Sequence, residues 1–138
     1  MAYQDPQFNV RYEVPVVFAA ASGTATASGT NSVATAITIP YKPKRATNIS
    51  AVRVRVTTAP AANWTALTHI LKNGTATFAT WATGTKTAGE WVDATVTAAN
   101  AKLDADTQPT CDYDGTGTAS AQTAGTFDIH FEVTEQFS

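Results

Sequence analysis

The sequence predicts an all-β protein: an antiparallel β-sandwich of the jelly-roll type, with seven or eight strands and an extended N-terminal arm. Three observations predict this fold class. Apolar and polar residues alternate in short segments, threonine and alanine make up over a third of the 138 residues, and loops rich in glycine and threonine separate the segments. The β-branched threonine side chain suits a pleated strand. Two packed sheets bury one face of each strand, and an immunoglobulin-like sandwich is the alternative topology.

The chain opens with the arm, residues 1–8, and the sandwich domain covers residues 9–138. The first strand is expected over 9–19. Pro15 within this strand has no amide hydrogen to donate, so the strand is expected at a sheet edge or at a bulge. The run of small residues that follows, 21–32, is expected to be a mobile loop.

Further strands are expected wherever the alternation returns. In the strand over 49–57 alternate valines point inward, whereas Arg53 and Arg55 point outward. The segment 97–108 holds the one helical turn that the sequence suggests. The expected strands after the first are 33–39, 49–57, two within the hairpin 67–87, 91–97, 109–115 and 126–137, the last with Phe127, Ile129, Phe131 and Val133 inward.

The hairpin contains Asn73-Gly74, a strong signal for a tight turn. A two-residue turn at these positions pairs Ala66 with Trp81. It places Leu67, His69, Leu71 and Phe78 on the core face and leaves large apolar side chains on the other face. A three-residue turn with a bulge would instead exchange the two faces of the second strand, so that its outward side chains would point inward. The outer face, predicted as a contact between copies of the chain, carries Thr68, Ile70, Thr77 and Trp81.

The charge and cysteine content exclude several classes of function. The net charge is −2, so no general electrostatic attraction to nucleic acid or anionic membrane is expected. Cys111 is the single cysteine, which excludes an intramolecular disulfide and a cysteine zinc site. There is no apolar run of membrane-spanning length and no leader-like start, so we expect synthesis in a cytoplasm.

No catalytic, cofactor or metal site is predicted. His69 and His130 lie in the middle of strands, where a histidine is usually structural, and no nucleophile or phosphate-binding motif accompanies them. The group Asp104, Asp106, Asp112 and Asp114 lacks the ligand spacing of a calcium loop and is expected to be solvated.

Two further features are candidates for binding. Lys42, Lys44 and Arg45 form a small basic loop that is a candidate rim contact to an acidic protein surface, although three charges are few for phosphate binding. Trp64, Trp81 and Trp91 would indicate sugar binding if they formed a row on one flat face, and core packing is the commoner role.

The order of segments resembles a known group of proteins. An apolar strand ending in FAAASGT is followed by NSVATAITIP, ISAVRVRVT, the hairpin LKNGTATFAT, the segment TAANAKLDADTQ and the closing strand TFDIHFEV. This order is similar to that of the jelly-roll cement, or head-decoration, proteins of tailed bacteriophages, and to the related heads of phage fibres and of tumour-necrosis-factor/C1q-like domains. Where members often carry Gly-Asp, this chain has Asp106-Thr107.

The resemblance implies a non-enzymatic virion protein on the outer capsid surface. Such a protein is often a homotrimer, and it bridges neighbouring copies of the major capsid protein and stabilises the head. An arm carrying Tyr3, Gln4 and Phe8 would clasp the capsid by adding to its strands. The alternative is a receptor- or carbohydrate-binding head of a tail fibre or appendage.

Overall fold

The computed structural model describes residues 9–19, 22–23, 29–32, 37–62, 64–83, 85–117 and 122–136. Nearly all regular structure in these segments is β, and the exception is a short 3-10 turn, η1 (Ala98–Asn100). This turn lies within the segment where the sequence suggested one. The expected arm, residues 1–8, lies outside the described residues.

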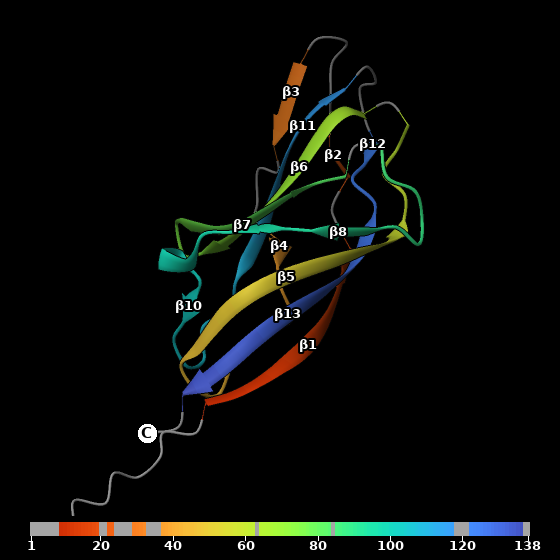
Figure 1. Ribbon diagram of the computed structural model, residues 1–138. Helices are drawn as coiled ribbons and strands as arrows, with labels where there is room; N and C mark the ends of the chain where they lie inside the picture. The colour runs from red at the N-terminus through yellow and green to blue at the C-terminus, as the bar shows by residue number, and fades with distance from the viewer. Residues whose placement is uncertain are drawn as a thin grey trace, which may run out of the picture.

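Two antiparallel sheets pack face to face (Figure 1). The first sheet has the order β1-β13-β5-β10, and β8 also pairs with β5. Its strands are β1 (Asn9–Ala19), β13 (Thr126–Gln136), β5 (Thr47–Thr58), β8 (Trp91–Asp93) and β10 (Lys102–Leu103).

The second sheet has the order β3-β11-β6-β7-β9, and β4 also pairs with β11. A separate pair of very short strands, β2 and β12, lies beside the two main sheets. The strands outside the first sheet are β3 (Gly29–Ser32), β11 (Thr110–Gly117), β6 (Trp64–Asn73), β7 (Ala76–Ala82), β9 (Thr95–Val96), β4 (Ile37–Thr38), β2 (Ser22–Gly23) and β12 (Gln122–Thr123).

The connectivity is that of a jelly roll. When β3 with β4, and β8 with β10, are each taken as one interrupted strand, the chain has eight principal strands in sequence order. With the principal strands numbered 1 to 8 along the chain, the order across one sheet is 1-8-3-6 and the order across the other is 2-7-4-5. The first strand pairs with the last, whereas an immunoglobulin sandwich pairs its first strand with its second. The predicted fold class is therefore confirmed, and the alternative topology is not adopted.

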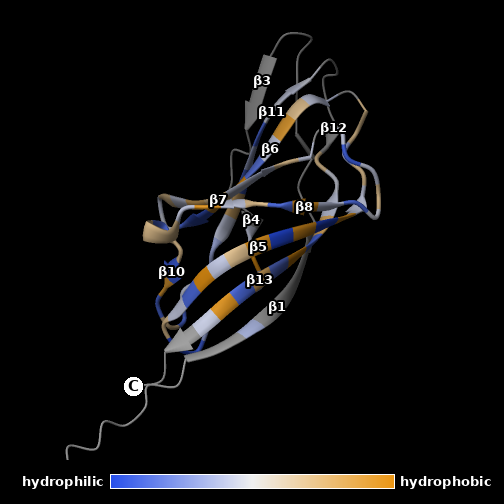
Figure 2. Cartoon of the chain, in the orientation of Figure 1, coloured by the Kyte–Doolittle hydropathy of each residue, from blue (hydrophilic) through white to orange (hydrophobic). Residues whose placement is uncertain are grey.

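The central pair β5 and β13 supplies one wall of the core. Cα partners across this pair include Val52 with Phe131 and Val54 with Ile129, and all four side chains are buried. Arg53 and Arg55 point away from the core, as the alternation predicted, and Figure 2 shows apolar and polar residues alternating along both strands. Strand β13 alternates strictly from Phe127 to Val133 and β5 does so from Val52 to Val56, so each buries a row of apolar side chains. A register shift opposite Glu132 and Val133 brings Ile49 inward as well.

Strand β1 forms the outer edge of the described part of the first sheet, which is where Pro15 was expected to place it. The expected strand over 91–97 is instead two strands in different sheets, because β8 pairs with β5 and β9 pairs with β7. Between them the Ala94 amide still donates to the Val52 carbonyl at 2.9 Å, so the chain crosses from one sheet to the other there.

Two expectations for the first third of the chain need adjustment. The stretch 21–32, expected as a mobile loop, contains the short strands β2 and β3. Of the expected strand over 33–39, β4 covers Ile37 and Thr38, and residues 33–36 lie outside the described residues.

The predicted hairpin register is wrong. Asn73 pairs with Ala76, so the turn residues are Gly74, which has φ of 61°, and Thr75. A bulge follows at Leu71 and Lys72, and beyond it His69 pairs with Trp81. These shifts turn the Trp81 side chain inward, where it is 3% exposed. Burial of the large indole favours this shifted register over the turn at Asn73-Gly74 that the sequence suggested.

Gly115 in β11 provides a test of the packing beneath β6. A Cβ atom at Gly115 would lie 2.7 Å from Cε3 of the buried Trp64 ring, so Gly115→Ala forces the indole to shift. We expect the substitution to lower the free energy of unfolding by about 1–3 kcal/mol, measured by urea denaturation. Asp114→Ala, at the exposed neighbouring position, is the matched control and should stay within about 0.5 kcal/mol of the parent. Equal effects of the two substitutions would contradict this packing.

Candidate functional site

The outer surface of the second sheet has few unpaired charges. We call it the Thr-rich face, and define it by three rows of Cα partners across β11, β6, β7 and β9. The rows are Thr110–Lys72–Thr77, Asp112–Ile70–Thr80–Thr95 and Asp114–Thr68–Ala82. Lys72 Nζ and Asp112 Oδ2 form an ion pair within this face, which leaves Asp114 as the remaining charge in the three rows.

Three of the four residues predicted to form a contact between copies lie on the Thr-rich face. Thr68, Ile70 and Thr77 are all half-buried. Trp81 does not join them, because the hairpin register turns its indole into the core against His69 and Phe127. The outward placement of Trp81 was therefore wrong, and Ile70 is the large apolar side chain in the three rows.

The basic loop is partly neutralised by an acidic residue from a distant segment. Asp106 Oδ1 lies 3.8 Å from Lys42 Nζ and 3.7 Å from Lys44 Nζ. The Asp106 amide donates to the Pro43 carbonyl at 2.7 Å, and Asp106 adopts φ of 61°, so the two loops are joined through the backbone as well. Arg45 is exposed beside them. The loop remains a candidate rim contact with a smaller excess of positive charge than its sequence suggested.

Two of the four aspartates considered for calcium binding take part in ion pairs, at two separate places. Asp106 contacts the basic loop, and Asp112 pairs with Lys72 on the Thr-rich face. Within the described segments, no three acidic, histidine or cysteine side chains come together as metal ligands.

His69 is a buried, uncharged member of the core. Its ring stacks on the Trp81 indole at a centroid distance of 5.0 Å and meets the Phe127 ring edge-on at 4.6 Å. Its Nε2 lies 3.0 Å from the Thr83 hydroxyl, and burial lowers the pKa of His69 from 6.5 to about 3. Its Nδ1 is buried and has no hydrogen-bond partner among the described residues.

This histidine–threonine pair resembles a base and nucleophile in spacing but not in electrostatics. An imidazole with such a low pKa is a weak proton acceptor at neutral pH. A catalytic histidine is usually held by a third group on its other nitrogen. The corresponding atom of His69, Nδ1, has no such partner among the described residues. The arrangement supports packing of the core.

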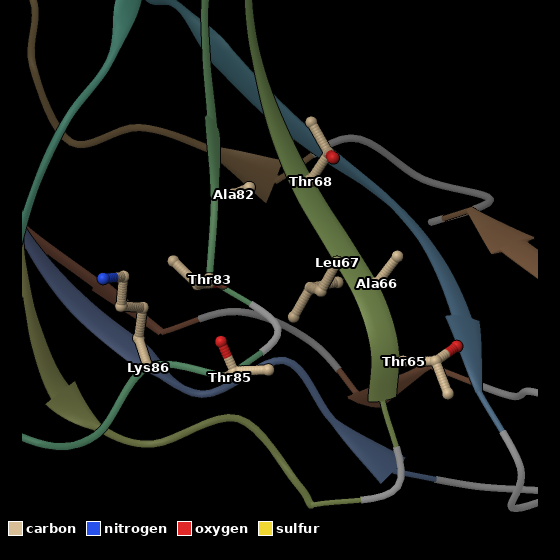
Figure 3. A pocket seen from close by; sticks show the side chains of 8 residues that line it. All are labelled: Thr65, Ala66, Leu67, Thr68, Ala82, Thr83, Thr85 and Lys86. Carbon is tan, nitrogen blue, oxygen red and sulfur yellow. The ribbon is translucent and has the colours of Figure 1, made fainter.

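Thr83 also lines a surface pocket of about 340 Å³ at the open end of the β6–β7 hairpin, opposite the turn. Figure 3 shows that small and hydroxyl-bearing side chains form most of its wall. Lys86 is its one charged lining residue, and Lys86 Nζ lies 3.4 Å from Glu90 Oε1. The Thr87 amide and hydroxyl donate to Glu90 and lower its pKa. The lining residues are Thr65, Ala66, Leu67, Thr68, Ala82, Thr83, Thr85 and Lys86.

Sequence reasoning missed a cluster on the outer surface of the first sheet. Trp91 is 44% exposed, and Arg53 Cζ lies 5.1 Å from its ring centroid. The His130 ring meets the indole edge-on at 5.1 Å, and Arg53 Nε donates to Asp93 Oδ1 at 3.2 Å. The signal in the sequence was the segment WVD, in which an inward Val92 implies an outward tryptophan and aspartate.

The three tryptophans do not form a row on one surface. Trp64 and Trp81 are each 3% exposed and belong to the interior, which leaves Trp91 alone at the surface. The three tryptophans therefore provide no extended aromatic platform for a polysaccharide chain, and Trp91 alone of the three exposes its ring.

Comparison with known proteins returned no relative: no protein-family description, curated protein or solved structure matches this chain. The described residues contain no helix long and apolar enough to cross a membrane.

The buried His69 predicts a loss of stability in mild acid. Its folded-state pKa lies below its unfolded value, so the unfolded chain binds a proton first and the free energy of unfolding falls as pH drops below 6.5. From about pH 7.5 to about pH 5 this group should remove about 2 kcal/mol, measured by urea denaturation.

Two variants assign this loss to His69. His69→Gln should flatten the profile between these pH values, whereas His130→Gln on the outer surface should retain the loss, because His69 is still present. A His69→Gln profile as steep as that of the parent would contradict burial of a neutral imidazole.

Proposed function

We propose that this chain is a structural virion protein, a cement or decoration protein that binds the outer surface of a capsid and bridges major capsid subunits. The single observation that supports the proposal most is the Thr-rich face. It is a broad sheet surface of small side chains with a paired Lys72–Asp112 and a central Ile70. The order of segments that resembles phage cement proteins supports it as well.

A face made of small side chains loses little conformational entropy when it is covered. Threonine and alanine side chains give up little conformational entropy on burial, whereas lysine and glutamate give up much more. The one cation of the three rows is already paired with Asp112, so covering Lys72 adds no unpaired positive charge, and the one remaining charge, Asp114, lies in an outer row of the face. The face is therefore suited to a lasting contact with another copy of the chain, with a trimer as the favoured assembly.

Attachment to the capsid is assigned to other parts of the chain. Tyr3, Gln4 and Phe8 of the arm, which lie outside the described residues, would add to a capsid strand. Lys42, Lys44 and Arg45 would contact an acidic rim of the major capsid protein. Many equivalent weak contacts over a shell strengthen one another by multivalency.

The contact between copies is tested by placing a charge at its centre. Ile70→Lys should dissociate oligomers into monomers at micromolar concentration in mass photometry, because an unpaired lysine would have to be desolvated. Its circular dichroism spectrum should match that of the parent. Thr58→Lys, at an exposed position on the first sheet, is the control and should leave the oligomer intact. A parent protein that is monomeric throughout this range would contradict the self-assembly.

The capsid contact is tested by removing the arm. A variant lacking residues 2–8 should keep the thermal transition of the parent and lose co-sedimentation with capsids, because the strand-adding segment is gone. Capsid binding equal to that of the full chain would reject the arm mechanism. Absence of the full chain from purified virions would reject the proposed function itself.

The second candidate function is a receptor- or carbohydrate-binding head. The exposed Trp91, with Arg53, Asp93 and His130 around it, is the observation that favours it. The burial of Trp64 and Trp81 limits such a site to one aromatic stacking position.

A further inference from the structure

Trp91 is held in a fixed position on an otherwise polar surface. It lies in β8, and its Cα partner across the strand pair is Arg55. The neighbouring Val92 packs against the core, so the backbone of β8 is anchored and the indole must point outward. Arg53 and His130 contact the ring from β5 and β13, at 5.1 Å from its centroid in each case. An exposed indole supported by neighbours from two other strands is a rigid, preorganised surface.

Charged groups surround the indole in an ordered way. Two rows of Cα partners cross the sheet here, Asp93–Arg53–His130 and Trp91–Arg55–Asp128. In the first row Arg53 Nε donates to Asp93 Oδ1 at 3.2 Å, so both side chains are fixed. In the second row Arg55 and Asp128 form no ion pair with another side chain of the described segments, and their hydrogen-bonding groups remain available to a ligand.

We propose that this cluster, Trp91 with Arg53, Arg55, Asp93 and Asp128, binds a neutral saccharide. A pyranose ring presents an apolar face of C–H groups, which stacks on an indole, and a rim of hydroxyl groups, each of which both donates and accepts hydrogen bonds. The guanidinium groups supply donors and the carboxylates supply acceptors around one exposed ring. The His130 ring meets the indole edge-on and the Arg53 guanidinium lies over the ring, so the sugar would stack on the part of the indole that stays exposed.

The charge balance is the reason for choosing a neutral ligand. Two arginines are matched by two aspartates, so the cluster has no net charge to attract a phosphate or a polyanion. A nucleic acid would need an excess of cations, which this surface does not have. Hydroxyl groups, by contrast, are satisfied by donors and acceptors placed side by side.

This inference does not depend on the proposed assembly through the Thr-rich face, because the two surfaces belong to different sheets. The two proposals also have separate tests. Lys102→Ala, at an exposed position on β10, lies in neither the Thr-rich face nor the Trp91 cluster and is therefore the control variant for saccharide binding.

The experiment uses the full chain on an array of immobilised neutral and acidic oligosaccharides, followed by titration of each positive saccharide with intrinsic fluorescence as the readout. We expect at least one neutral saccharide to bind and to change the emission of the exposed Trp91. Trp91→Ala should weaken binding at least about tenfold, which corresponds to about 1.4 kcal/mol. Lys102→Ala should bind as the parent does, and Asp128→Asn tests the carboxylate rim with an isosteric change.

The outcomes separate cleanly. Binding of a neutral saccharide that is lost in Trp91→Ala and kept in Lys102→Ala supports the site. No retained saccharide on the array, retention of acidic saccharides alone, or equal affinity of Trp91→Ala and the parent would each overturn it. Thermal unfolding of Trp91→Ala close to that of the parent shows that a loss of binding does not come from a loss of fold.

Discussion

The rest of the structure depends on one contact, the stack of the His69 imidazole on the Trp81 indole. Phe127 from the opposite sheet packs against both rings. The two stacked rings come from neighbouring strands of the second sheet, and Phe127 comes from the first. The three rings therefore fix the register of the β6–β7 hairpin and join the two layers at one point. Because side chains alternate along a strand, fixing His69 and Trp81 inward fixes Thr68, Ile70 and Thr80 outward. The composition of the Thr-rich face follows from this core contact.

The same alternation gives the two outer surfaces of the sandwich different chemistry. The second sheet presents threonine, alanine, Ile70, the Lys72–Asp112 pair and Asp114. The first sheet presents arginines and acidic residues on β5 and β13, with Trp91 of β8 among them. The two proposals assign assembly to the surface of the second sheet and recognition of a small ligand to that of the first.

The sequence was sufficient to predict the elements whose signal is local. Strands β5 and β13 were predicted with their inward rows, because alternation with period two is visible in each segment by itself. The hairpin register was not predictable, because it depends on which residues occupy the turn and on a bulge at Leu71 and Lys72 that long-range packing of Trp81 favours. The Trp91 cluster was missed for a related reason. It requires β8, β5 and β13 to lie side by side, and they are distant in sequence.

The central claim is that the Thr-rich face is covered when the protein assembles. Labelling of a single cysteine introduced on this face tests that claim most directly. Thr80 lies within the face, and the native Cys111 is buried with its pKa raised to about 12, so it should not compete for a maleimide reagent. The rate of maleimide labelling of Thr80→Cys should fall steeply as protein concentration rises into the assembling range, while that of Thr58→Cys on the first sheet stays constant. A labelling rate at Thr80→Cys that does not change with concentration or on capsid binding would contradict the account.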